Sequence, residues 1–506
     1  MLGTLVLLAG LATGLAWWTS TPDTPRETTS DTREDGPSAS LRDASVVLPP
    51  LLPEADPPAP AEPPASAGLG AVDACSSGDD DPPVARPSTT ELLQLRLAEL
   101  NDRMLARQRS PNASAELRAG WEAVQDPARV DEGLRLLARA PDRLDAGFDT
   151  YVAMLVVVAA NALHEGRASR AAALAEQASR AAPEDALPLV VGAVAEQAQG
   201  QHLASRALLI RAFALEPEEP AIAYSLAWRL ADGADVQAAL TAFDAYLEAV
   251  PGDRAMARQR ARLQIRAASF AEALTYVRGG VRLVATPALP RERAMHVLDV
   301  VDAGLVRGAQ ILGVAPREEL AVFVHADRDA MRRATCVQGW AGAVFDGALE
   351  LDEVTVATDA GDPSITHECF HAAVHPAVPN VPTWLDEGLA QYVSGEEGPA
   401  HLRSYELMIR ERTWIPFASM NDAFLVIDDS SDAGLAYHQA LLMVDWLVER
   451  RGERGIADAA HWLIGGGDGS RVLAEAARAE LDGEALLEFT GRHVAALRAR
   501  GHAPEP

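Results

Sequence analysis

Residues 362–375 read DPSITHECFHAAVH, and residues 382–395 read PTWLDEGLAQYVSG. In the first stretch, His367 and His371 stand four positions apart, and Glu368 follows the first of them. Positions four apart lie on one face of a helix, so both imidazoles can reach a single Zn²⁺ ion while Glu368 lies beside it. The Asp-Pro-Ser sequence ahead of an apolar run predicts that a helix begins there.

The second stretch offers a third zinc ligand. A catalytic zinc takes three protein ligands and keeps one position open for water. Glu387, on a second predicted helix, completes a set of two histidines and one glutamate. The sequence therefore predicts a metal site formed by His367, His371 and Glu387.

The two motifs in this order, HECFH and then WLDEGLAQY, resemble the gluzincin metallopeptidases, in particular the peptidase MA-like group. The resemblance covers about residues 288–495 and includes the later segment AYHQALLMVDWLVERRGERGI. It implies an α+β zincin-like domain in which His367, His371 and Glu387 bind zinc and Glu368 is the general base. Zinc then lowers the pKa of its water toward about 7 and polarises the scissile carbonyl.

The expected mechanism needs a further group to stabilise the negative charge that develops on the carbonyl oxygen. Tyr437 and His438 are the candidates, and Tyr437 stands where related gluzincins often carry a tyrosine. Asp386 and Gln391 are candidates for orienting the ligands. The segment GWAGAVFDGALELDE upstream is where zincins place the edge strand that pairs with a substrate. It has no G-x-M-E-N sequence of the aminopeptidases, so the expected activity is that of an endopeptidase.

A helical repeat precedes this domain. Pro183, Pro217 and Pro251 stand 34 residues apart, which is the tetratricopeptide period. Small residues recur in two phases of that period, where paired helices must approach closely. They are Ala159, Ala193, Ala227 and Ala261 in one phase, and Ala171, Ser205, Ala239 and Ala273 in the other. The resemblance to tetratricopeptide repeats implies a surface that recruits a peptide substrate or a protein partner; the alternative is a rigid spacer.

The N-terminal part differs in composition. Residues 2–18 are uncharged and mostly apolar, and at 1.5 Å per residue they come close to spanning a bilayer. Trp17 and Trp18 favour a membrane anchor over a cleaved signal, and a buried helix is the third alternative. Either membrane-related alternative places the bulk of the chain outside the cytoplasm, anchored or secreted. The next segment is rich in Pro, Asp, Ala, Ser and Thr, which predicts a disordered linker.

The predicted organisation is that of a multidomain chain, with an all-α tetratricopeptide-like solenoid followed by the α+β peptidase domain. Its parts are a signal or anchor at 1–18, a linker at 19–90, a helical segment at 91–147, repeats at 148–287 and a gluzincin domain at 288–500.

Composition excludes several other functions. The basic residues are all arginine, 44 against 73 acidic residues, for a net charge of −29. The absence of lysine excludes Schiff-base and phosphate-loop lysines, and such a negative chain is a poor ligand for nucleic acid. The alanine and arginine bias suggests a GC-rich bacterial genome. Three cysteines, Cys75, Cys336 and Cys369, allow at most one disulfide.

Two functions fit these patterns. The first is a zinc peptidase whose repeats recruit a substrate or partner. The second is a non-catalytic repeat scaffold with a zincin-derived binding domain, but a scaffold has no need of Glu368.

Overall fold

The computed structural model describes residues 75, 89–108, 110, 113–139, 150–337, 342–378, 381–412, 414–416, 419–420, 430–464 and 483–500. These residues all belong to one compact unit, residues 72–506. The predicted signal or anchor at 1–18, and the predicted linker apart from residues 75, 89 and 90, lie outside the described residues. Within the described ranges, no helix is both long enough and apolar enough to cross a membrane.

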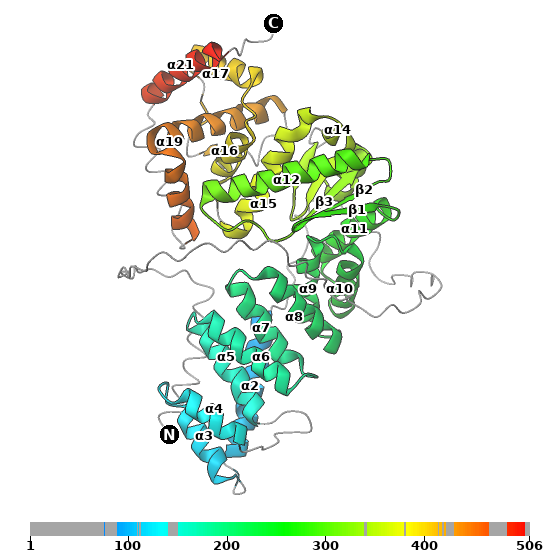
Figure 1. Ribbon diagram of the computed structural model, residues 1–506, viewed down its shortest axis with the longest axis vertical. Helices are drawn as coiled ribbons and strands as arrows, with labels where there is room; N and C mark the ends of the chain where they lie inside the picture. The colour runs from blue at the N-terminus through cyan, green and yellow to red at the C-terminus, as the bar shows by residue number, and fades with distance from the viewer. Residues whose placement is uncertain are drawn as a thin grey trace. The chain divides into compact units, whose positions relative to one another are not determined.

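The described elements are mostly helices, with one small mixed sheet (Figure 1). In chain order they are α2 (Thr89–Gln108), α3 (Ala115–Val124), α4 (Val130–Arg139), α5 (Thr150–His164), α6 (Ala168–Ala181), α7 (Ala186–Ala198), α8 (His202–Leu215), α9 (Pro220–Ala231), α10 (Val236–Ala249), α11 (Arg254–Ser269), β1 (Leu274–Arg278), β2 (Val281–Ala285), α12 (Arg291–Leu312), β3 (Leu320–His325), α13 (Arg328–Thr335), β4 (Ala343–Phe345), β5 (Leu349–Asp352), α14 (Glu353–Val356), η1 (Asp359–Gly361), α15 (Asp362–Ala377), α16 (Thr383–Ser394), α17 (Pro399–Glu411), α19 (Ser430–Ile464) and α21 (Gly483–Ala499).

The helices from α5 to α11 follow the 34-residue period. α7, α9 and α11 begin at residues 186, 220 and 254. Each is preceded by an acidic residue, Asp185, Glu219 or Asp253, whose side chain accepts a hydrogen bond from a backbone N–H in the first turn. Such a cap satisfies one of the free donors at a helix start. The repeated proline and acidic residue therefore mark the turn that enters each new helix.

The small residues of the repeat occupy buried positions through α10. These fully buried residues are Ala159, Ala193, Ala227, Ala171, Ser205 and Ala239. The last member of each phase, Ala261 or Ala273, is only half-buried. The pattern weakens there because α11 is followed by strand β1, whereas α5, α7 and α9 are each followed by a second helix.

The sheet has the strand order β1-β2-β3-β5-β4. β2, β3 and β5 are parallel, whereas β1 and β4 are antiparallel to their neighbours. β1 and β2 fall within residues 148–287, where the sequence predicted repeats. In the structure the helical pairs stop at α11, and residues 274–285 belong to the sheet. The strands of this sheet therefore begin before residue 288, the predicted domain boundary.

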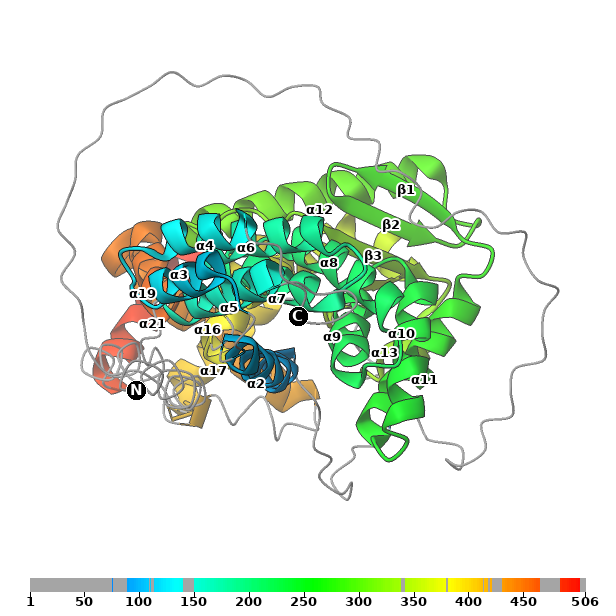
Figure 2. The ribbon, with the colours of Figure 1, turned by 90° about the horizontal axis from the view of Figure 1, so that it is seen from below.

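Both faces of the central strand β3 are covered, and β3 is buried along its whole length. On one face, Val322 and Val324 pack with α12 and α15. On the other, Phe323 packs with Phe270, which follows α11, and with residues around the start of α10. Figure 2 shows α12 on one side of the strands, and α11 and α13 on the other. The last helices of the 34-residue period thus supply part of the packing of the sheet.

A buried ion pair joins the repeat helices to the sheet. Arg266 of α11 pairs through Nη2 with Glu350 of β5, a fully buried carboxylate. Arg266 Nη1 also donates to the carbonyl oxygen of Ala231, at 3.1 Å. The second carboxylate oxygen of Glu350 lies 2.6 Å from Nε2 of His325. A buried carboxylate needs such partners because burial without them is costly.

The zinc-motif helix packs closely against α12. A Cβ at Gly304 would lie 2.8 Å from the Cβ of Cys369, so glycine permits the close approach of α12 and α15. Cys369 is a fully buried free thiol, and burial raises its pKa. It therefore belongs to the core. Cys336 forms a disulfide with Cys75, a pairing that the sequence left open.

Candidate zinc site

Two short helices carry the predicted ligands. α15 has Pro363 in its first turn, where a missing N–H costs nothing. α16 ends at Gly395, whose φ of +69° is the left-handed conformation that glycine adopts readily. His367 and His371 lie one turn apart on α15, and Glu387 lies on α16. The structure therefore matches the two-helix arrangement expected from the motifs.

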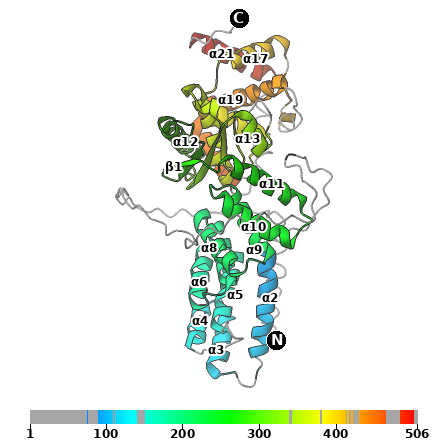
Figure 3. The same cartoon turned by 90° about the vertical axis from the view of Figure 1, so that its right-hand side faces the viewer.

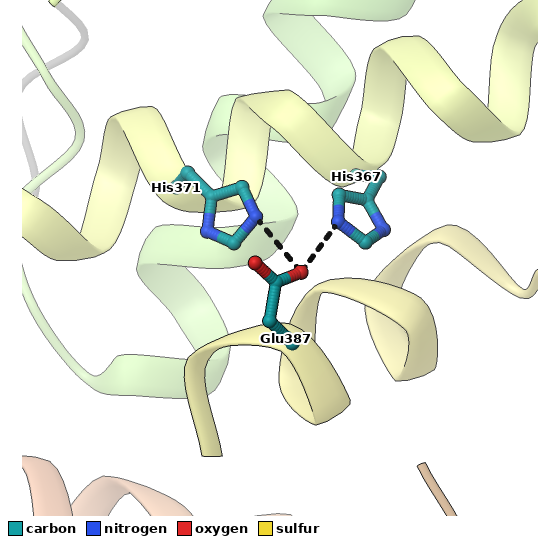
Figure 4. Close-up of side chains that lie close together, drawn as sticks. All are labelled: His367, His371 and Glu387. Carbon is teal, nitrogen blue, oxygen red and sulfur yellow. Dashed lines mark hydrogen bonds and ion pairs between the residues drawn. The ribbon is translucent and has the colours of Figure 1, made fainter. Parts of the chain in front are cut away.

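The three predicted ligands converge (Figure 4). Glu387 Oε2 lies 3.2 Å from Nε2 of His367 and 3.6 Å from Nε2 of His371. One ligand atom from each residue lies within 4.8 Å of the other two. Both histidines are buried. Two imidazole nitrogens and a carboxylate oxygen in one small space are the donor set of a catalytic zinc site, so the residues fit this ion.

The electrostatics also favour a cation at this point. Burial opposes charge on His367, but its hydrogen bond to Glu387 and its ion pair with Glu396 raise its pKa to about 10. His371 is also buried, and its bonds to Asp386 and Glu387 raise its pKa well above the usual value. Burial likewise opposes the charge of Glu387, yet the two histidines lower its pKa to about 2. The carboxylates thus create a negative site that is neutralised by protons or by a metal ion.

Asp386 contacts one predicted ligand. Its Oδ1 lies 2.9 Å from Nδ1 of His371, which is the contact that a ligand-orienting carboxylate would make. Its Oδ2 lies 2.8 Å from Nε2 of His375, an exposed residue. His375 lies outside the two motifs and was not a candidate from the sequence. Its position four residues after His371, on the same helix face, is the sequence feature that could have indicated this contact.

Glu368 is held by the neighbouring strand. Its Oε2 accepts a hydrogen bond of 2.8 Å from the backbone N–H of Phe345 in β4. Burial raises the pKa of Glu368, and the nearby histidines oppose that shift. A carboxylate with a raised pKa beside a metal site suits general acid and base work.

β4 is an edge strand next to this carboxylate. The backbone carbonyl of Gly342 accepts a hydrogen bond from the N–H of Asp352, and the N–H of Asp346 donates one to the carbonyl of Ala348. The even-numbered residues of this segment therefore direct their backbone groups toward β5 and the turn before it. Successive residues of a strand direct their backbone groups to opposite sides. Ala343 and Phe345 therefore turn their backbone groups away from β5. This matches the expected edge strand upstream of the motif.

Tyr437 and His438, the two candidates for stabilising the oxyanion, lie in different surroundings. Burial raises the pKa of Tyr437, and so do the carboxylates of Glu387 and Glu368, which places its hydroxyl in their field. His438 instead contacts α17, where its Nδ1 lies 2.6 Å from Oγ of Ser404. Burial, and then nearby His401, lower the pKa of His438 to about 3. The structure thus brings Tyr437 toward the three ligands and directs His438 toward α17.

Gln391 of α16 forms hydrogen bonds to backbone groups of α16 and α19. Its Nε2 donates to the carbonyl oxygens of Glu387, at 3.1 Å, and of Tyr437, at 2.9 Å. Its Oε1 lies 3.2 Å from Nε2 of His401. Gln391 therefore ties the backbone of the ligand helix to α19 rather than touching a ligand side chain.

Comparison with known families agrees with this geometry. Residues 300–472 match the family model described as the Peptidase MA superfamily. The matched range begins within α12 and includes α15 and α16. A search of curated proteins found no match. The match supports a zincin-like peptidase domain in this part of the chain, next to the mostly helical N-terminal part.

Proposed function

We propose that the protein is a zinc-dependent peptidase. The observation that carries this proposal is the convergence of His367, His371 and Glu387 beside Glu368. The first three residues would hold the ion, which would act as a Lewis acid and make water more nucleophilic. Glu368 is the residue for which a purely structural zinc site has no use.

The chain's own groups suit the remaining steps of peptide hydrolysis. An extended substrate would lie along β4, at the outward-facing backbone of Ala343. Glu368 would take a proton from water as its oxygen bonds to the carbonyl carbon. It would then give that proton to the amide nitrogen as the C–N bond breaks, leaving a carboxyl group and an amine. Tyr437, whose pKa is raised by burial and by the carboxylates of Glu387 and Glu368, would donate from its hydroxyl to the carbonyl oxygen as charge develops there.

The Phe345 contact gives Glu368 a defined position before the reaction. Its N–H binds one carboxylate oxygen and so leaves the other oxygen for the reacting water. An open edge strand accepts any extended chain, which favours the endopeptidase activity expected from the sequence.

Several wider features of the proposal come from the sequence. Tetratricopeptide-like repeats would recruit a substrate or protein partner, and residues 1–18 would direct or anchor the chain outside the cytoplasm. The Cys75–Cys336 disulfide supports an extracytoplasmic location, because disulfides persist in oxidising compartments.

The test compares the purified full chain with its Glu368→Gln variant. We expect both proteins to bind about one zinc ion per chain, since Glu368 is not a ligand, and only the parent to cleave an unstructured protein substrate. The variant retains the shape of the side chain and removes the base. A zinc-loaded parent that cleaves no better than the variant would favour the non-catalytic scaffold, and a parent without zinc would exclude the metal assignment.

A further inference from the structure

Helix α2 does not form a pair with the helix that follows it. It contacts α3 only at a few positions, and it also contacts α5, α7 and α9, which are the first helices of three successive pairs. In Figure 3, α2 (blue) runs beside α5 along the helical part of the chain. A single helix that crosses three repeats contacts the surface that those repeats form together.

The contact is apolar and follows one stripe of α2. The stripe is buried in a single cluster with residues of α5, α7 and α9, and consists of Leu92, Leu93, Leu97, Leu100 and Met104. These spacings place the side chains on one helix face. Leu95, on another face, is 61% exposed. The helix is therefore amphipathic, and its apolar side faces the repeats.

A charged contact fixes the position of α2 along this surface. Arg96 Nη2 lies 3.1 Å from Glu216 Oε2 and 3.4 Å from Glu219 Oε2. The two glutamates belong to the turn between α8 and α9. A guanidinium facing two carboxylates selects the register of the helix, although such half-exposed pairs add little stability.

The repeat helices do not need α2 to contact each other. α5 packs on α6, α6 on α7, α7 on α8 and α8 on α9. α2 therefore lies on a surface that the pairs complete without it. In this respect α2 resembles a bound amphipathic helix in a groove, whose apolar side chains act as anchors.

We infer that the face formed by α5, α7 and α9 is a helix-binding surface, and that α2 is its resident intramolecular ligand. The partner that fits it is a protein segment that forms an amphipathic helix with the same leucine stripe and an arginine opposite Glu216 and Glu219. A tethered ligand has an effective concentration on the order of millimolar. A partner must therefore displace α2 before it can bind, and this inference stands independently of peptidase activity.

The test uses a labelled synthetic peptide of residues 89–108 and three full-length proteins. These are the parent, a Leu97→Glu/Leu100→Glu double variant, and a Leu95→Glu control. The double variant places charges on the apolar stripe of the resident helix, whereas the control changes its exposed face. We expect the peptide to bind the double variant at least about tenfold more tightly than the parent or the control, because competition from the tethered helix is lost.

Circular dichroism and the unfolding temperature show whether the double variant keeps its repeats. If the repeats unfold, or if they stay folded and the peptide does not bind, α2 is an integral structural helix and the inference is wrong. Sedimentation shows whether the ligand comes from the same chain. A monomeric parent is expected, whereas a dimer that dissociates on adding the peptide would show that a second copy donates its α2 and would overturn the intramolecular assignment. A peptide carrying Leu97→Glu must fail to bind, since otherwise the binding is not through the stripe.

Discussion

Asp386 accepts a hydrogen bond at Oδ1 from Nδ1 of His371, at 2.9 Å. In the neutral imidazole that a metal ion needs, this bond keeps the proton on Nδ1 and leaves Nε2, the nitrogen that faces Glu387, as the ligand atom. A carboxylate in this position also makes the imidazole a better metal ligand. Asp386 therefore determines both the orientation and the tautomer of one predicted zinc ligand.

Replacing Asp386 should weaken zinc binding without removing a ligand. We expect Asp386→Asn to lower zinc affinity by about 10–100-fold, the usual effect of losing such a partner. Competition with a chromophoric chelator measures this. His375→Ala is the matched control, because it removes the exposed contact on the other carboxylate oxygen and should have a smaller effect. Equal affinities for the parent and Asp386→Asn would contradict the orienting role.

Zinc binding should release protons and strengthen as the pH rises. The raised pKa values of His367, about 10, and of His371 mean that both are protonated near pH 7 in the metal-free chain. Zinc needs their neutral forms, so binding should release about two protons at pH 7, against less than one for unperturbed histidines. Calorimetry in buffers of different ionisation enthalpy counts these protons.

The control for this proton count is Glu396→Gln. Glu396 Oε2 lies 3.4 Å from Nδ1 of His367 and raises its pKa. Removing this charge should lower the pKa of His367, and so reduce the number of protons released when the count is repeated at about pH 9–10, close to that pKa. Release of less than one proton by the parent at pH 7 would show that the histidines are already neutral.

Gly388 should tolerate no side chain. A Cβ there would lie 2.6 Å from the carbonyl oxygen of Ala440 in α19. Gly388→Ala should therefore push α16 away from α19, cost about 1–3 kcal/mol in the free energy of unfolding, and weaken zinc binding through the adjacent Glu387. Gly491→Ala in α21 is the control, because no atom lies within 4 Å of its new Cβ. Urea unfolding and zinc titration compare the two variants, and similar behaviour would argue against tight packing of α16.

The Arg266–Glu350 pair should contribute strongly to the free energy of unfolding. Arg266→Ala leaves the fully buried Glu350 without its guanidinium partner, which should cost about 3–5 kcal/mol. Arg260→Ala, on the same helix, removes a pair with the exposed Asp244 and should cost about 0–1 kcal/mol. Urea midpoints of the two variants measure the difference. Equal midpoints would mean that Glu350 finds another partner or is protonated.

The residues that converge in the candidate site could be named from the sequence because their pattern is local. His367 and His371 are related by one helical turn, and Glu387 follows on the next helix. Residues 320–325, LAVFVH, contain a continuous apolar run of strand length, and residues 291–312 repeat apolar positions at helical spacing. Such local patterns are typical of the elements found there, β3 and α12.

Features that depend on distant segments could not be predicted. Cys75 and Cys336 are 261 residues apart, and no local pattern pairs them. Strands β1 and β2 lie in the range where the sequence predicts repeats, because Ala273 continues one phase of the 34-residue period. The position of α2 depends on a surface formed by three separate helix pairs. The amphipathic pattern of α2 predicts that it has an apolar face, but not which surface that face contacts.

The packing of Phe270 and Arg266 against the sheet has a consequence for synthesis on the ribosome. Chains are made from the N-terminus, and domains fold in that order as they emerge. Helices α5 to α11 leave the ribosome before any strand does. They can therefore present a finished apolar surface on which β2, β3 and β5 assemble, so we expect the helical part to serve as a template for the folding of the half that carries the candidate zinc site.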